Sequence, residues 1–155
     1  MKAVRWEGKV ESVSVKEIDI PKIRQPLDVI VRITSAGICG TDLHTYHGRI
    51  EMNVPLTFGH ENVGIIEEIG SAVTTLKKGD RVVVADLDGG ADVNDVIDVD
   101  GFFGIGNYGS FPQMNGGQAQ FMHVPNADVN VLKLPPGDEH ELDYVLLADI
   151  WPTAW

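Results

Sequence analysis

Apolar and polar residues alternate in several short stretches of the chain, which is the pattern of strands with one buried face. In residues 28–34, Val29, Val31 and Ile33 fall on one face, and residues 63–69 repeat the alternation. Further short strands are expected at 81–84, 118–123 and 131–134. Because these stretches recur about every ten residues, the pattern favours a β-barrel or sandwich.

Helical spacing is clear only near the end of the chain. Val145, Leu146 and Ile150 recur at helical intervals after an acidic start that includes Asp138 and Glu141. Acidic residues are favoured in the first turn of a helix. We therefore expect helix in this last stretch and little helix elsewhere.

Charge and composition exclude several classes of function. The 155 residues include 12 Lys and Arg against 23 Asp and Glu, a net charge of −11, and no basic cluster is denser than Lys77-Lys78. Nucleic acid is therefore not an expected partner. No apolar run approaches the roughly 20 residues that span a bilayer, so a membrane is not expected either. The charged start, residues 1–7, does not suit a signal peptide, and we expect a cytoplasmic location.

Two segments have features of binding loops, but in both we expect an ordinary loop that binds no ligand. Residues 86–100 contain six aspartates, but their spacing is irregular and the closing Glu of a calcium loop is missing. A solvated acidic loop between two strands is expected. Residues 104–109 fit G-x-G-x-x-G, but Pro112 discourages the helix that a dinucleotide site requires, so we expect a glycine-rich loop without bound cofactor.

The densest chemistry lies in residues 37–64. The single cysteine, Cys39, excludes an internal disulfide and a zinc site with several thiolates. Together with His44, His47 and His60 it offers the sulfur and nitrogen donors that zinc prefers. The alternatives are a cysteine that acts as a small buried apolar residue and histidines that lie on the surface. Spacing alone does not decide between these interpretations.

The segments 37–44 (GICGTDLH) and 59–64 (GHENVG) resemble the signature of the zinc-dependent alcohol dehydrogenases, in the medium-chain dehydrogenase/reductase family. Similar stretches occur at 1–4, 78–82, 116–119 and 147–153. The resemblance implies a GroES-like fold over residues 1–155: an irregular, mostly antiparallel β-barrel with a few short helices. It also implies an alcohol or carbonyl compound of small size as the substrate.

The resemblance further implies one catalytic Zn²⁺ and its ligands. Cys39 and His60 match ligand positions, and Asp149 matches the third position, where many members have Cys and one branch has Asp. Glu61 would lie beside the metal and serve as a transient ligand.

The same resemblance assigns the proton chemistry. Thr41 would carry the hydroxyl that accepts the proton of the alcohol, and His44 would pass that proton towards solvent. Asp42 would orient His60.

Two departures from the family pattern shape the functional hypothesis. The four closely spaced cysteines of the structural zinc lobe are missing after residues 81–84, where the acidic segment stands instead. The Rossmann domain that binds NAD(P) would begin after Trp155 and is absent from this sequence. The chain is therefore expected to be the zinc- and substrate-binding domain of an alcohol or aldehyde oxidoreductase, unable to transfer hydride alone.

Two alternatives remain open from the sequence. One is a stand-alone zinc metalloenzyme of lyase, isomerase or hydratase type, which needs no nicotinamide. The other is a non-catalytic binding module that forms a homo-oligomer through its aromatic end, which contains Trp151 and Trp155.

Overall fold

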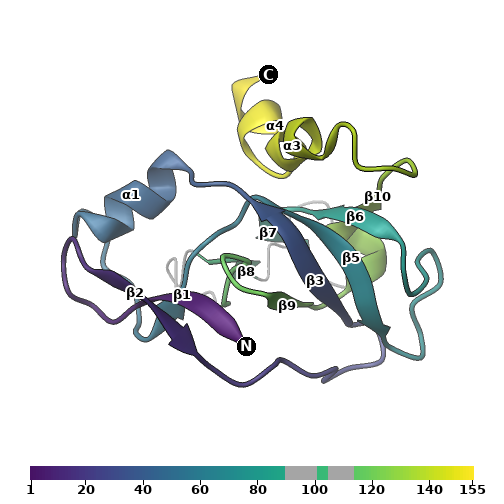
Figure 1. Ribbon diagram of the computed structural model, residues 1–155, viewed down its shortest axis with the longest axis horizontal. Coiled ribbons are helices and arrows are strands. Elements are labelled where there is room, and N and C mark those ends of the chain that lie inside the picture. Colours follow the sequence, from purple (N-terminus) through teal and green to yellow (C-terminus); the bar gives the residue numbers. More distant parts are fainter. Residues whose placement is uncertain (90–100, 105–113) are drawn as a thin grey trace.

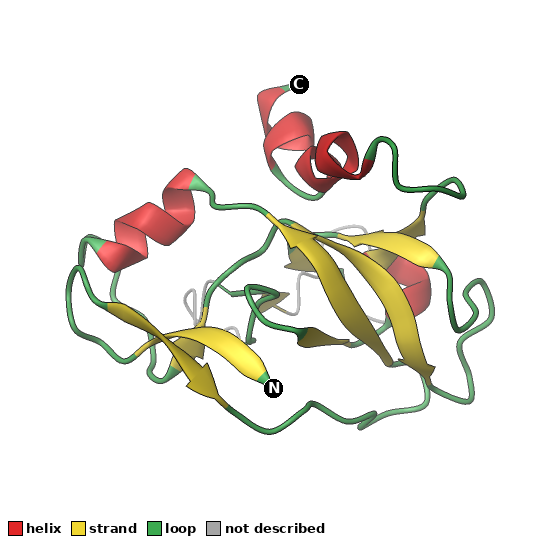
Figure 2. Cartoon of the chain, in the orientation of Figure 1, coloured by secondary structure: helices red, strands yellow, loops and turns green. Residues whose placement is uncertain are grey.

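Antiparallel strands are the main regular structure of the chain, and a few short helices accompany them (Figures 1 and 2). The computed structural model describes residues 1–89, 101–104 and 114–155. The predicted mainly β fold class is confirmed. Most of the acidic segment and of the glycine-rich loop, as sequence analysis defined them, lies outside the described residues.

A five-stranded antiparallel sheet is the centre of the fold. Its order is β10-β6-β5-β3-β9. The strands are β3 (Val29–Ala36), β5 (Asn62–Ile69), β6 (Arg81–Val84), β9 (Phe121–Val124) and β10 (Val131–Lys133). Val29 and Val31 are fully buried in the main core and Ile33 packs against it, as the alternation predicted. Burial of such branched side chains stabilises the fold by about 1.5–3 kcal/mol each.

Two smaller sheets complete the β structure. The first has the order β2-β1-β4 and contains β1 (Lys2–Trp6), β2 (Val13–Glu17) and β4 (Leu56–Thr57). It is held by a core of Trp6, Leu56 and Phe58. The second is a ribbon of β7 (Leu87–Asp88) and β8 (Gly101–Phe102). At residues 87–88 the expectation of a solvated loop was wrong, because Asp88 of β7 is buried and accepts a hydrogen bond from Asn130, whereas residues 90–100 lie outside the described part of the chain.

The helices are all short, and two of them were not expected. The predicted C-terminal helical stretch is present as α3 (Glu141–Tyr144), the 3₁₀ turn η1 (Val145–Leu147) and α4 (Ile150–Ala154). The expectation of few helices is confirmed, because the described residues outside that stretch form only α1 (Gly40–Tyr46) and α2 (Ala127–Asn130), although the positions of these two were not predicted. The buried residues of α1 are polar, Asp42 and Thr45, so this helix has no apolar stripe for a hydropathy pattern to reveal.

α1 and the C-terminal helices α3 and α4 lie at the same end of the central sheet (Figure 1). In Figure 1, α1 follows the end of β3, and α3 and α4 lie above the ends of β3 and β6. An apolar cluster docks the C-terminal helices on the strands; it contains Val63, Val83, Leu134, Val145 and Ala148. No helix in the described ranges has the length and apolarity needed to cross a membrane.

Candidate metal centre

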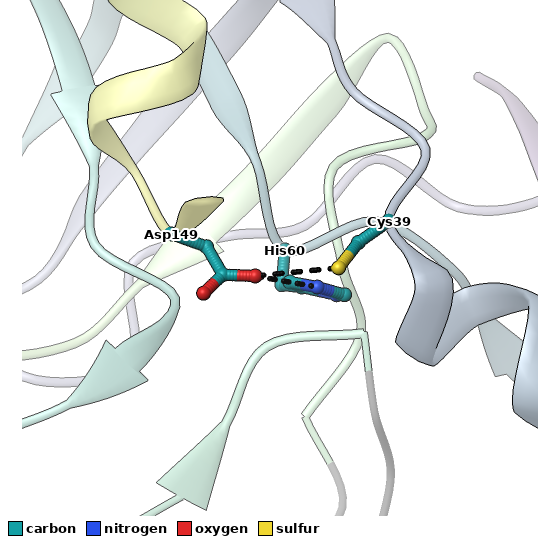
Figure 3. A group of neighbouring side chains, drawn as sticks. All are labelled: Cys39, His60 and Asp149. Carbon is teal, nitrogen blue, oxygen red and sulfur yellow. Dashed lines mark hydrogen bonds and ion pairs between the residues drawn. The ribbon is translucent and has the colours of Figure 1, made fainter. Parts of the chain in front are cut away.

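Three metal-ligating side chains converge from parts of the chain that are distant in sequence. Cys39 immediately precedes α1, His60 lies just before β5, and Asp149 lies between η1 and α4. One donor atom from each lies within 4.8 Å of the other two. Figure 3 shows the three side chains pointing toward one another, with dashed lines from the Asp149 carboxylate to both His60 and Cys39. The structure thus brings together three of the four predicted ligands.

The spacing of the donor atoms suits a tetrahedral ion. Asp149 Oδ2 lies 3.4 Å from Cys39 Sγ and 3.2 Å from His60 Nε2. Zinc bonds of 2.0–2.3 Å at tetrahedral angles place neighbouring ligand atoms about 3.3–3.6 Å apart. A zinc ion with three protein ligands keeps a fourth position for water or substrate.

The imidazole of His60 supports the same interpretation. His60 is 1% exposed, yet neither ring nitrogen has a hydrogen-bond partner within the described part of the chain. Buried polar atoms are normally paired. A metal ion would bind Nε2. Asp42 Oδ1 lies 3.6 Å from the other nitrogen, Nδ1, and has no hydrogen-bond partner among the described residues. A small movement would let Asp42 accept a hydrogen bond from Nδ1–H.

Negative charge is concentrated around the three ligands. Burial, with the nearby Asp149 charge adding to it, raises the pKa of Asp42 and of Glu61 and brings the pKa of Asp86 to about 6. Burial also raises the pKa of the Cys39 thiol. A divalent cation would offset this repulsion and favour the thiolate.

Glu61, the fourth predicted ligand, lies outside the group of three. Its side chain is 5% exposed and packs against Gly37, where an added Cβ would stand 2.3 Å from Glu61 Oε2. The buried carboxylate is therefore next to the site without joining it in this arrangement. Its role as a transient ligand stays a prediction.

The two residues predicted to move the proton lie on α1. Thr41 Oγ1 is 3.8 Å from Cys39 Sγ, so the hydroxyl borders the donor atoms. His44 lies one turn further along α1, is exposed, and has its Nδ1 3.4 Å from Arg49 Nη1. Within the described ranges no hydrogen bond joins Thr41 to His44. Asp42 lies in the first turn of the same helix, and its Oδ2 accepts the Cys39 backbone N–H at 3.0 Å.

Two further residues support the site and were not found from the sequence. Thr153 Oγ1 donates to Asp149 Oδ1 at 2.8 Å, which leaves Oδ2 facing the other ligands. The Asp86 backbone N–H donates to the Ala148 carbonyl at 3.3 Å, next to Asp149. The spacing of Asp149 and Thr153, four residues apart, could have indicated the first contact. No local pattern distinguished Asp86 from the other aspartates of the acidic segment, so the sequence did not indicate its place beside Asp149.

Comparisons with known proteins agree with this geometry. Residues 25–136 match the family model of the alcohol dehydrogenase GroES-like domain. A zinc-type alcohol dehydrogenase-like protein, AdhB of Bacillus subtilis, is 38% identical over all of this chain and 44% of its own length. The chain thus spans less than half the length of this relative.

Solved structures give the same result. The alcohol dehydrogenase of Thermus sp. ATN1 matches with a TM-score of 0.85 and 37% identity, over 99% of this chain and 45% of that one. A short chain alcohol dehydrogenase from Escherichia coli, complexed with NADH, matches with a TM-score of 0.75 and 26% identity, over 95% of this chain and 42% of that one. The matched region again covers under half of each relative.

Proposed function

The chain belongs to the family of alcohol dehydrogenase GroES-like domains, and from that premise we propose that residues 1–155 form the zinc- and substrate-binding domain of an alcohol or aldehyde oxidoreductase. The observation that carries the proposal is the convergence of Cys39, His60 and Asp149, whose donor atoms lie within 4.8 Å of one another. The zinc-type alcohol dehydrogenase-like relative from Bacillus subtilis supports the choice of reaction class.

In this proposal Cys39, His60 and Asp149 hold one Zn²⁺, and Glu61 is the additional carboxylate within reach. A thiolate with an imidazole selects zinc over the hard cations that prefer oxygen ligands alone. The bound ion would supply Lewis-acid polarisation of the substrate oxygen and lower the pKa of an alcohol hydroxyl.

The remaining residues of the site orient the ligands and move a proton. Asp42 would accept a hydrogen bond from His60 Nδ1–H, which fixes the tautomer and leaves Nε2 free to bind the ion. The Thr41 hydroxyl, beside Cys39, accepts the proton of a bound alcohol at Oγ1. Thr41 would at the same time give up its own hydroxyl proton to a bridging water, because no described hydrogen bond joins it to His44, and the exposed imidazole of His44, one turn away on α1, would pass a proton on to solvent.

Hydride transfer in this proposal depends on a nicotinamide-binding region outside these 155 residues. The Escherichia coli relative is complexed with NADH and is more than twice the length of the matched region. The proposed substrate is a small alcohol or carbonyl compound, because the ion must hold its oxygen at the open fourth position.

The proposal is tested by joining this chain to the remaining part of the Thermus sp. ATN1 alcohol dehydrogenase. The fusion should oxidise simple alcohols with NAD(P), measured as reduced nicotinamide absorbance. Asp149→Asn should abolish this activity, whereas Asp143→Asn, which removes an exposed carboxylate, should leave it unchanged.

Two results would redirect the assignment. Turnover by the unfused, zinc-loaded chain without nicotinamide would indicate a stand-alone lyase, isomerase or hydratase. A fusion that folds and binds zinc and nicotinamide but reduces none would contradict the oxidoreductase assignment.

A further inference from the structure

The segment that carries Asp149 is built from short helical pieces that are not held by their own caps. α3, η1 and α4 have four, three and five residues, and none has a side-chain cap hydrogen bond. Helices this short are unstable in isolation. The position of Asp149 must therefore be set by contacts between this segment and the central sheet.

Apolar contacts supply part of that attachment. Val145 and Ala148 pack against Val63 of β5 and Val83 of β6. Such contacts are not directional, so they favour burial of the segment without fixing how far it slides or turns on the sheet.

Polar contacts of Glu141, the first residue of α3, fix how the segment is placed on the sheet. Glu141 Oε2 forms an ion pair with Arg81 Nη1 of β6, and Glu141 Oε1 accepts a 2.6 Å hydrogen bond from Ser35 Oγ of β3. The Arg81 and Glu141 side chains are only 19% and 12% exposed. One carboxylate thus binds β6 and β3, the two strands on either side of β5, through charge-assisted contacts.

Asp143, in the same helix, provides the contrast. Its side chain is 79% exposed and pairs only locally with His140, three residues earlier. Removal of this carboxylate changes the charge of α3 as much as removal of the Glu141 charge would, but it breaks no described contact between α3 and the sheet.

We propose that Arg81, Glu141 and Ser35 are positioning residues for the metal centre, which act by holding the α3–η1 segment so that Asp149 faces Cys39 and His60. This inference rests on the proposed function, because it takes Asp149 as a zinc ligand. It adds Ser35 and Glu141, which lie in none of the family-like stretches, and it gives a role to Arg81, which lies in the stretch 78–82.

The test is the zinc dissociation constant of the whole 155-residue chain, measured by competition with a chromophoric chelator. Glu141→Gln keeps an acceptor for Ser35 and loses the ion pair. It should weaken zinc binding about tenfold or more, as for other residues that orient metal ligands. Asp143→Asn should bind as the original chain does. Arg81→Lys, which keeps the charge, should lose less than Glu141→Gln.

A second background separates positioning from general damage to the fold. In Asp149→Asn chains, Glu141→Gln should cause no further loss of affinity, because the side chain through which it acts is already altered. If Glu141→Gln does not fold by circular dichroism, Ser35→Ala replaces it, with a smaller loss expected in the same direction and again no loss in the Asp149→Asn background.

Three outcomes would overturn the inference, and they are distinguishable. Equal zinc affinity in Glu141→Gln and Asp143→Asn would reject the positioning role while the proposed function stands. Equal losses in both backgrounds would show a general structural effect. A folded original chain that binds no zinc would reject the proposed function and this inference together.

Discussion

At the scale of single residues, Gly37 shows how tightly the neighbourhood of the metal centre is packed. An added Cβ would stand 2.3 Å from Glu61 Oε2, which is far inside van der Waals contact. Gly37→Ala should therefore destabilise the chain by about 1–3 kcal/mol, the usual cost of overpacking. The measurement is the free energy of unfolding in urea.

Gly40→Ala is the matched control for that substitution. Gly40 lies at the start of α1 and a Cβ there would meet nothing within 4 Å. Because alanine favours helix, Gly40→Ala should leave stability unchanged or raise it by up to about 1 kcal/mol. Equal effects of the two substitutions would refute the packing argument.

Asp28 gives a residue-scale prediction about pH. The carboxylate is 1% exposed, and although burial alone would raise its pKa, hydrogen bonds from His123 and from two backbone amides bring the pKa below its ordinary value of 3.8. A lowered native pKa means that the native state binds fewer protons than the unfolded state. The stabilisation is therefore complete above the ordinary pKa and is lost as the pH falls through the native one.

Asp28→Asn should cost about 1.5–3 kcal/mol near neutral pH, because it removes charge-assisted hydrogen bonds. The difference from the original chain should shrink between about pH 5 and about pH 2. Urea unfolding at several pH values tests this, with the exposed Glu68→Gln as the control. A penalty that is independent of pH would argue against the ionised carboxylate as its source.

Single residues also show where sequence reasoning succeeded. Cys39, His60 and Asp149 were identified because they lie in a family signature, and the structure brings their side chains together. The contacts of Glu141 were missed because they join positions far apart in the sequence and leave no local motif. The contact of Thr153 was missed although its four-residue spacing from Asp149 could have indicated it.

At the scale of elements, strands were easier to predict than helices. β3, β5 and β6 have alternating or continuous apolar residues that the central sheet buries, and hydropathy records this directly. α1 begins where Asp42 accepts the Cys39 amide, and its buried side chains are polar. A helix specified by such contacts is invisible to a hydropathy pattern.

The candidate metal centre predicts which helices and strands should become more rigid when zinc binds. Its ligands come from the start of α1, the approach to β5 and the turn between η1 and α4. Zinc should cross-link these segments and suppress their local opening. Hydrogen exchange followed by mass spectrometry should slow most in α1 and in η1–α4 when zinc is added.

The internal control for that experiment is β2. This strand is exposed throughout and pairs only with β1 among the described strands, away from the ligands. Its exchange should change little. Slowing that is strongest in β2, or absent from α1, would contradict a metal centre at Cys39, His60 and Asp149.

At the scale of the whole molecule, the fold places the candidate metal centre where the sheet, α1 and the C-terminal helices meet (Figure 1). The fold class was predictable because the family signature and the strand spacing agree on it. The stacked Trp151 and Trp155, with Trp155 96% exposed, form the aromatic end for which sequence analysis raised self-association, and that role stays a prediction.

The central claim is that a thiolate, an imidazole and a carboxylate of this chain hold one divalent ion. The most direct measurement is the absorption spectrum of the chain titrated with Co²⁺, a spectroscopic substitute for zinc. We predict saturation at about one ion per chain with a thiolate-to-cobalt charge-transfer band that is lost in Cys39→Ser. A folded chain that binds no cobalt, or binds it with a spectrum unchanged by Cys39→Ser, would contradict the claim.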